Sequence, residues 1–169
     1  MIYKNENLSK YNWFNLGGPA KIFFKPNSNS DLKNFLKKNV NDEKNIYVLG
    51  AGSNTLFRDS GFNGIVIKLG KDFSYINLLE DNKIEVGAAT LDKKISDFAT
   101  ENSISGFEFL SCIPGSIGGS ILMNSGCYGH DISKIFFSLK AMNLQGEIKL
   151  FKKDEIKFIY RGSNFSKDL

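Results

Sequence analysis

The most informative segment of this 169-residue chain is Ile113-Pro114-Gly115-Ser116-Ile117-Gly118-Gly119-Ser120. Its three glycines fall within five residues, and each would cost about 1 kcal/mol relative to Ala in the interior of a helix. Such a cost indicates that another group approaches the backbone closely. The Pro-Gly-Ser turn suits the N-terminus of a helix, where free N–H groups and the helix dipole favour an anion. Close packing of a helix on a strand is the alternative interpretation.

A second glycine-rich segment, Val48-Leu49-Gly50-Ala51-Gly52-Ser53-Asn54-Thr55, begins with an apolar, strand-like run. Glycine permits positive φ angles and lets the backbone approach a ligand. Successive N–H groups in such a turn form a concavity for anions, and Ser53, Asn54 and Thr55 could add side-chain donors. The segment lacks the Lys of a Walker loop and the third Gly of the dinucleotide fingerprint. A tight turn between strands therefore stays an equal alternative, although two such loops in one chain favour a ligand with two phosphates.

The segments around the first loop predict a βαβ unit. Residues 20–25 alternate and end at Pro26, as a strand does. Ser30 is placed to cap a helix. The apolar run 45–49 predicts a buried strand after that helix, and 64–69 a further strand.

The rest of the chain predicts two hairpins and a helix between them. The hairpins cover residues 73–86 and 136–151, the latter turning at Gln145-Gly146. Thr90 is placed to cap a helix that turns Leu91 and three later apolar residues inward.

We therefore predict an α+β fold in two parts. Residues 1–70 form a βαβ-like subdomain, and residues 71–169 combine antiparallel strands with helices.

Composition restricts the function class. The net charge of +4 and the pI of about 8.9 come from lysines spread along the chain, not from a basic run. A nucleic-acid partner is disfavoured, whereas an anionic small molecule suits this charge. No apolar run is long enough for a membrane span, and the N-terminus has no secretory pattern, so we expect a cytoplasmic protein.

Four single side chains have ordinary interpretations. Cys112 and Cys127 are expected to be reduced thiols, and the lone His130 excludes a multi-histidine metal centre. Trp13 is expected to be a core or inter-strand aromatic residue instead of a group that stacks on a cofactor.

The motifs also occur in a familiar order. They are residues 12–20 (NWFNLGGPA), 48–55 (VLGAGSNT), 106–119 (GFEFLSCIPGSIGG), 123–129 (MNSGCYG) and 160–165 (YRGSNF). This order resembles the UDP-N-acetylenolpyruvoylglucosamine reductase (MurB) family. More broadly, it is similar to FAD domains of the vanillyl-alcohol-oxidase or PCMH type.

The resemblance implies a two-subdomain PCMH-type fold with FAD between the parts. It implies that the first loop surrounds the FAD pyrophosphate from one side, through Gly50, Ala51, Gly52, Ser53 and Asn54. The second loop would do so from the other side, through Gly115, Ser116, Ile117, Gly118 and Gly119. Three further residues would lie near the cofactor, namely Asn124, Gly126 and Tyr128.

The resemblance also implies a reaction. In the family, NADPH reduces the flavin, which delivers hydride to the enolpyruvyl group of a UDP-sugar and gives UDP-N-acetylmuramate for peptidoglycan synthesis. Arg161 matches the family's Tyr-Arg-x-Ser motif and would stabilise negative charge developing on the substrate carboxylate. Tyr160 and Ser163 would contact the substrate and position Arg161. No obligate protein partner is implied.

The chain departs from the family pattern at its end. The family's proton-donating Ser and a second acidic residue lie beyond this motif, but the chain stops at Leu169. We therefore expect most of the C-terminal substrate domain to be missing and the fragment to be inactive alone. Two alternatives stay open. One is another PCMH-type FAD oxidoreductase, with Cys127 or His130 attached to the flavin, and the other is a non-catalytic FAD-binding module.

Overall fold

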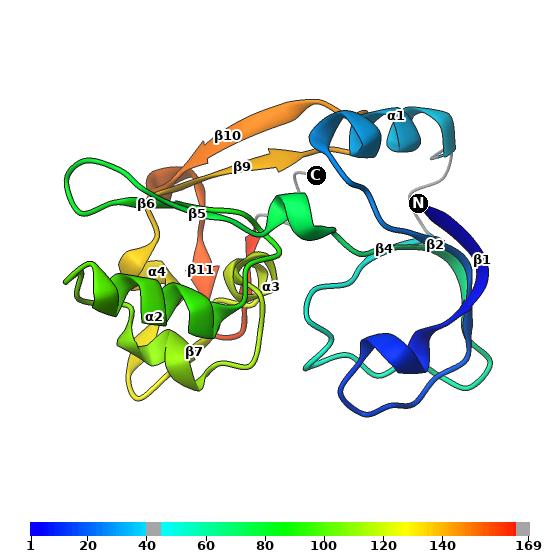
Figure 1. Cartoon of the computed structure of the whole chain (residues 1–169), viewed down its shortest axis with the longest axis horizontal. Helices are drawn as coiled ribbons and strands as arrows, with labels where there is room; N and C mark the ends of the chain where they lie inside the picture. Colours follow the sequence, from blue (N-terminus) through cyan, green and yellow to red (C-terminus); the bar gives the residue numbers. More distant parts are fainter. Residues whose placement is uncertain (40–44, 165–169) are drawn as a thin grey trace.

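The computed structural model describes residues 1–39 and 45–164 (Figure 1). Its N-terminal half contains a four-stranded sheet in the order β1-β2-β4-β3. The strands are β1 (Ile2–Asn7), β2 (Pro19–Phe24), β3 (Ile46–Val48) and β4 (Phe62–Ile67). β1 is antiparallel to β2, whereas β2 and β3 both run parallel to β4.

Helix α1 (Asn29–Asn39) links β2 to β3, so the predicted βαβ unit is present, with β4 between its strands. Two details of the prediction are wrong. Ser28, not Ser30, caps α1, because the Ser28 Oγ accepts a hydrogen bond from the Asp31 N–H at 3.0 Å. β3 is an edge strand, and its Val48 side chain is 64% exposed instead of buried.

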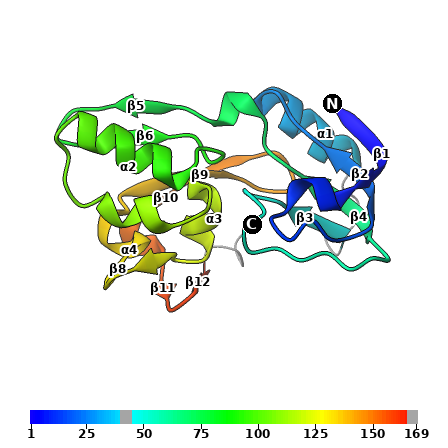
Figure 2. The same cartoon turned by 60° about the horizontal axis from the view of Figure 1, so that its bottom comes forward.

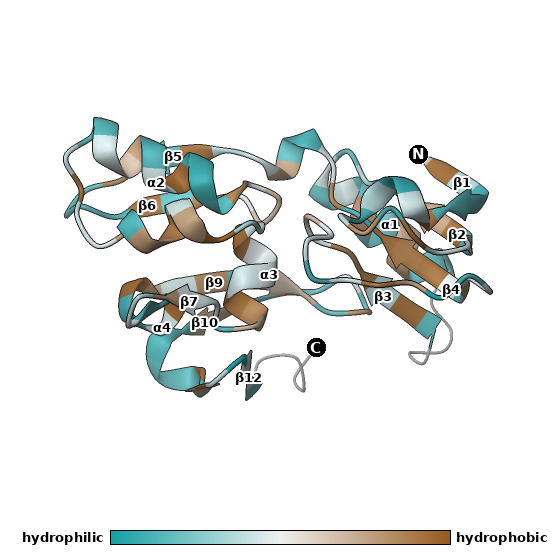
Figure 3. Cartoon of the chain, turned by 90° about the horizontal axis from the view of Figure 1, so that it is seen from below, coloured by the Kyte–Doolittle hydropathy of each residue, from teal (hydrophilic) through white to brown (hydrophobic). Residues whose placement is uncertain are grey.

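The sheet of the N-terminal half has a hydrophobic cluster on each face. Neighbouring residues of a strand point to opposite faces, so Phe23 joins one cluster with Leu8 and Val66, while Phe24 joins the other. α1 covers the second face, where the Phe24 and Phe35 rings stack with centroids 3.8 Å apart. Figure 3 shows the apolar residues concentrated in β2 and β4.

The C-terminal half consists of short elements around a third cluster. Its strands pair as the antiparallel hairpins β5 (Ile76–Leu78) with β6 (Ile84–Val86), β7 (Gly126–Cys127) with β8 (His130–Asp131), β9 (Ser138–Met142) with β10 (Ile148–Lys152), and β11 (Phe158–Ile159) with β12 (Gly162–Ser163). Its α-helices are α2 (Asp92–Glu101), α3 (Ile117–Leu122) and α4 (Ile132–Ile135).

Short 3₁₀ helices connect these elements. They are η1 (Leu8–Tyr11), η3 (Lys71–Phe73), η4 (Glu108–Cys112) and η5 (Lys153–Glu155).

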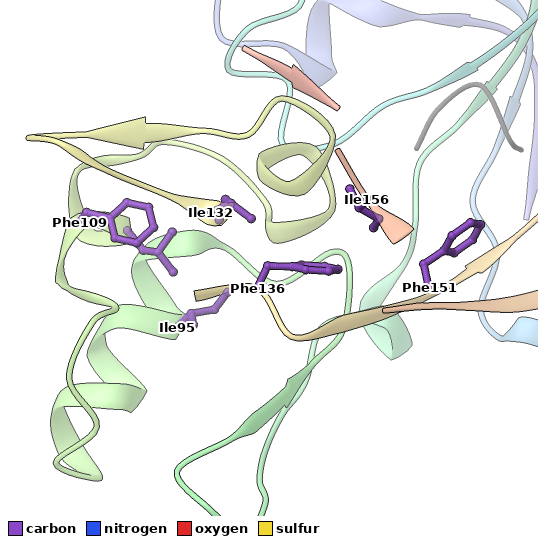
Figure 4. Close-up of a cluster of buried hydrophobic side chains, with 7 residues drawn as sticks. Ile95, Phe109, Ile132, Phe136, Phe151 and Ile156 are labelled. Atoms are coloured by element: carbon purple, nitrogen blue, oxygen red, sulfur yellow. The ribbon is translucent and has the colours of Figure 1, made fainter. Parts of the chain in front are cut away.

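The third cluster joins α2, η4, α4 and the last strands. Figure 4 draws its side chains as sticks and labels six of them, and the full set is Ile95, Phe109, Leu110, Ile132, Phe136, Phe151 and Ile156. Both predicted hairpins of this half are present, including the turn at Gly146. The mixed helix and strand content confirms the predicted α+β class.

The start of α2 differs from the prediction. Thr90 does not cap the helix, because its Oγ1 donates to the Tyr75 carbonyl at 3.1 Å. The helix begins at Asp92, which turns Leu91 outward (46% exposed) and buries Asp92 completely. Trp13 is likewise neither a core nor an inter-strand residue, since it is 62% exposed and lies in a turn.

The β9–β10 hairpin reaches from the C-terminal half to α1 (Figures 1 and 2). Met142 and Leu144, near the turn, pack on the cluster that contains Phe35 and Leu36 of α1. At Gly146, an added Cβ would lie 2.8 Å from the Cγ of Lys33 in α1. The hairpin therefore joins the cores of the two halves.

No helix in the described residues is both long and apolar enough to span a membrane.

Candidate functional site

The first glycine loop leaves the sheet at the carboxyl end of β3. The Leu49 N–H still donates to the Ile67 carbonyl at 2.8 Å, and the chain then turns away. Within the described residues, the backbone N–H groups from Gly50 to Asn54 donate no hydrogen bond. Unpartnered N–H groups in a glycine-rich turn are the donors that an anion requires.

Gly52 fixes the shape of this loop. Its φ angle is +80°, and an added Cβ would lie 2.1 Å from the Tyr11 carbonyl oxygen. The Gly52 carbonyl also accepts the Trp13 N–H at 3.0 Å. A side chain is therefore excluded here both by backbone conformation and by contact.

The second glycine loop opens α3, as predicted. Ser116 is the N-cap residue and is extended, with φ −114° and ψ 148°. Two N–H groups of the first turn are already used, because Ile117 donates to the Thr90 carbonyl and Gly118 to the Ala88 carbonyl. Among the described residues, the N–H groups of Ser116 and Gly119 have no acceptor. This loop thus keeps two of the five predicted donors free.

The two loops meet. A Cβ added to Gly50 would lie 2.9 Å from the Ser116 Oγ, so the loops approach closely at this point. Figure 2 shows α3 on the side of the C-terminal half that faces the N-terminal half. The two loops that carry the unpartnered N–H groups therefore come together between the halves.

Lys68, which belongs to neither glycine motif, supplies positive charge at the same place. Its Nζ donates to the Gly50 carbonyl, and the side chain is half-buried. Burial, together with the charge of Lys25, lowers the pKa of Lys68. The signal in the sequence was a lysine that ends an otherwise apolar strand, Ile65-Val66-Ile67.

Asp92 is the second residue that was missed. Its carboxylate lies behind the second loop, where Oδ2 accepts from the Ser120 Oγ at 2.6 Å. A Cβ on Gly115 would be 2.7 Å from the same oxygen, and the Asp92 N–H donates to the Gly115 carbonyl at 3.1 Å. Burial raises the pKa of Asp92 to about 6, against a smaller lowering by the Ser120 hydrogen bond.

Three further residues, Asn124, Gly126 and Tyr128, were predicted to lie near the cofactor. The Asn124 side chain is engaged at both ends, accepting the Ser133 N–H at 3.0 Å and donating to the Ile159 carbonyl at 3.2 Å. Gly126 belongs to β7, where an added Cβ would overlap the His130 carbonyl at 2.3 Å. Tyr128 is 87% exposed in the turn between β7 and β8. A cofactor contact of these three residues stays a prediction.

The Tyr160-Arg161 motif forms the turn between β11 and β12. Arg161 has a φ angle of +55°, and its guanidinium carbon lies 5.4 Å from the centre of the Tyr160 ring. Both side chains are exposed. Ser163 donates through its Oγ to the Leu122 carbonyl at 3.2 Å, which ties the turn to the end of α3. The helix that begins at the second glycine loop therefore also anchors the arginine turn.

The fold and this site define a class of protein. Residues 20–163 match the family model described as FAD binding domain. The chain belongs to this family of FAD-binding domains.

Sequence comparison with curated relatives indicates one family of FAD-binding proteins in particular. The chain is 48% identical over 163 residues to the UDP-N-acetylenolpyruvoylglucosamine reductase of Pelagibacter ubique, covering 96% of this chain and 54% of the relative. It is 46% identical over 166 residues to the reductase of the same name from Rickettsia typhi, covering 98% and 56%. The chain thus spans about half the length of the curated relatives it matches. These identities confirm the resemblance to the FAD-binding part of the MurB family.

Solved structures agree with the fold. The crystal structure of MurB from Thermus caldophilus superimposes with a TM-score of 0.80 at 29% identity, over 96% of this chain and 57% of that one. The 6-hydroxy-D-nicotine oxidase of Arthrobacter nicotinovorans superimposes with a TM-score of 0.64 at 12% identity, over 92% and 36%. The second likeness concerns the fold alone, and together they confirm the predicted PCMH-type architecture.

Proposed function

We propose that this chain binds FAD with the pyrophosphate between the two glycine loops. The observation that carries the proposal is the meeting of Gly50 and Ser116, with unpartnered N–H groups on both loops. A dianionic pyrophosphate needs several donors and a compensating charge. The N–H groups of residues 50–54, those of Ser116 and Gly119, and the Lys68 ammonium group meet this need.

The backbone of the first loop and the charge of Lys68 also suit a phosphate group. Gly50 carries no side chain where it meets Ser116, so a phosphate can approach the backbone of the first loop directly. Burial lowers the pKa of Lys68 in the absence of a ligand. A bound pyrophosphate would favour the charged form of this lysine, which is the form that attracts phosphate.

The proposed reaction is reduction of UDP-N-acetylglucosamine enolpyruvate to UDP-N-acetylmuramate with electrons from NADPH. When bound, FAD supplies the hydride chemistry. Arg161 would hold the carboxylate of the substrate and stabilise its developing negative charge. Tyr160 supports the guanidinium from one face, at 5.4 Å. A role in peptidoglycan synthesis and a cytoplasmic location go with this proposal.

The first experiment compares two substitutions at Gly119. A Cβ there would lie 3.8 Å from the Ser116 Oγ, an ordinary van der Waals contact, so the backbone at this position tolerates a Cβ. Gly119→Asp places a negative charge beside the phosphates and should weaken FAD binding by at least tenfold in a flavin fluorescence titration. Gly119→Ala should keep FAD binding within a fewfold of the parent. Equal affinities of the Asp and Ala variants would contradict our placement of the pyrophosphate.

Gly119 is a better probe than its neighbour Gly118. A Cβ at Gly118 would lie 3.0 Å from the Ala88 carbonyl oxygen, so any substitution there disturbs packing whether or not FAD is bound.

The second experiment separates the two half-reactions in the gene product that contains this chain. Arg161→Lys retains a charge but loses the planar fork of donors that pairs with a carboxylate. We expect reduction of the enolpyruvyl substrate to slow about 100-fold or more, with flavin reduction by NADPH unchanged. Equal slowing of both half-reactions would remove Arg161 from the proposed role.

A covalently bound flavin would favour the alternative oxidase function. Cys127 is poorly placed for such a bond, because its thiol donates to the Phe109 carbonyl at 3.2 Å and burial raises its pKa. We expect acid precipitation to release the flavin into the supernatant. Flavin that stays with the precipitate would instead support the oxidase.

A further inference from the structure

Asp92 is a buried carboxylate that the proposed binding of FAD does not use. It is fully inaccessible to solvent, and it lies in the first turn of α2. Only Oδ2 has a partner, the Ser120 Oγ at 2.6 Å. Oδ1 is buried with no hydrogen-bond partner in the described residues. A buried, half-satisfied carboxylate is costly when ionised, so its presence here requires a reason.

Its position supplies the reason. Asp92 touches the second glycine loop from behind, because Oδ2 would lie 2.7 Å from a Cβ on Gly115 and the Asp92 N–H binds the Gly115 carbonyl. Ser120, which donates to Asp92, follows Gly119 in α3. The carboxylate and a bound pyrophosphate would therefore face each other across a single layer of backbone.

No other charge compensates Asp92. Within the described part of the chain it forms no ion pair. The second loop and α3 contain no titratable side chain. The titratable groups of the neighbouring elements include Lys93, Lys94, Asp97 and Glu101 of α2, Glu108 and Cys112 of η4, and Tyr75 and Glu85 near β5 and β6. Lys93 is exposed and pairs with Asp97 at 3.1 Å, and Glu85 pairs with Lys140 at 3.9 Å.

We propose that Asp92 couples FAD binding to proton uptake. The carboxylate is ionised in the free protein at neutral pH, and when the pyrophosphate binds on the other side of the loop its pKa rises, so that a fraction of a proton is taken up from solvent. Two negative charges close together in a site of low dielectric constant repel each other, so keeping both ionised costs free energy. Asp92 is thus a positioning residue whose charge sets the affinity of the second loop for anions, an inference that rests on the proposed binding of FAD.

Thermodynamic linkage fixes the direction of the effect. Because FAD favours the protonated carboxyl group, protons must favour bound FAD to the same extent. Each unit by which FAD raises the pKa of Asp92 makes the FAD dissociation constant about tenfold smaller below this transition than above it. The pyrophosphate itself stays ionised over this range, so the slope belongs to the protein.

The test compares the parent chain with Asp92→Asn, which keeps the shape and removes the charge, and with Asp97→Asn on the exposed side of the same helix. FAD dissociation constants are measured by flavin fluorescence from about pH 5.5 to about pH 8, and proton uptake by calorimetry in buffers of different ionisation enthalpy. We expect affinity of the parent and of Asp97→Asn to fall about tenfold across this range, with proton uptake near pH 7. Asp92→Asn should bind FAD more tightly than the parent at pH 8, with neither slope nor uptake.

Other results would overturn the proposal in distinct ways. Weaker binding by Asp92→Asn at every pH would make Asp92 a structural brace for Ser120 only. A parental pH slope in Asp92→Asn would assign the coupling to another group. Absence of FAD binding by the parent at every pH would reject the proposed cofactor, and the coupling with it. NMR of the Asp92 carboxyl group tests the coupling in the parent chain without any variant. A pKa of Asp92 that does not rise after FAD is added would contradict it.

Discussion

Among single residues, Asp92 should have the clearest effect on stability. Its pKa is raised by burial to about 6, from 3.8 in an unfolded chain. A carboxyl group whose pKa is raised by folding stabilises the folded state, and this contribution is complete when the pH is below the pKa of the unfolded chain. The contribution is lost as the pH rises through the pKa of the folded chain. We expect the free energy of unfolding to fall by about 2 kcal/mol between about pH 4.5 and about pH 7.5 from this group.

Urea denaturation at the two pH values measures this loss. Asp92→Asn should remove it and should be more stable than the parent at the higher pH. Asp97→Asn, which changes an exposed carboxylate on the same helix, should keep the parental pH dependence. An unchanged pH dependence in Asp92→Asn would show that this carboxyl group is not the one that titrates.

Gly52 and Gly129 form a second matched pair. Their φ angles are +80° and +76°, but a Cβ at Gly52 would overlap the Tyr11 carbonyl at 2.1 Å, whereas a Cβ at Gly129 would meet nothing within 4 Å. Gly129→Ala should cost about 1 kcal/mol, the cost of a left-handed backbone alone. Gly52→Ala should cost about 3 kcal/mol or more, because overlap is added. Similar unfolding midpoints in urea for both variants would mean that the first loop relaxes away from Tyr11.

At the scale of elements, local patterns predicted most helices and strands but not their neighbours. The hairpin at 136–151 and its turn were predicted because alternation and a Gln-Gly turn are local signals. The exposure of Val48 was not, since it depends on β4 lying between β2 and β3, and strand order is not encoded in a short window.

The candidate site was predictable to a similar extent. Glycine spacing indicated both loops, and their order indicated the family. The sequence could not predict that the N–H groups of Ile117 and Gly118 are already hydrogen-bonded. Their acceptors, the carbonyl groups of Thr90 and Ala88, come from a distant segment. The burial of Asp92 could have been predicted from the sequence. It lies three residues before Ile95 and seven before Ala99, which is the spacing of one helix face, and both of these residues are buried.

The neighbouring glycines of α3 should respond in opposite directions. At Gly119 an added Cβ would make an ordinary van der Waals contact with the Ser116 Oγ at 3.8 Å, so Gly119→Ala should stabilise the FAD-free chain by up to about 1 kcal/mol. Gly118→Ala places a Cβ 3.0 Å from the Ala88 carbonyl oxygen, so we expect a net loss of about 1 kcal/mol. Thermal unfolding of the two variants without FAD measures both. A gain in both would show that α3 can move away from Ala88.

Across the whole molecule, the β9–β10 hairpin contacts the hydrophobic clusters of both halves. Met142 and Leu144 come from the C-terminal half, yet they pack on the cluster built by α1 and the sheet of the N-terminal half. Because burial of apolar side chains is the main source of coupling between packed units, these two side chains should transmit stability between the halves.

Hydrogen exchange in the native state can measure that coupling. In the parent, the slowest amides of β2 and β4 and those of α2 should exchange with the same free energy, as they do when a chain opens as one unit. The double variant Met142→Ala, Leu144→Ala should lower both stabilities and separate the two values by about 1 kcal/mol or more. Ile148→Ala is the control, since it truncates an exposed side chain of the same hairpin and should leave the values equal. Two values that differ already in the parent would mean that the halves open independently, so that FAD bound between the loops would be the principal connection between them.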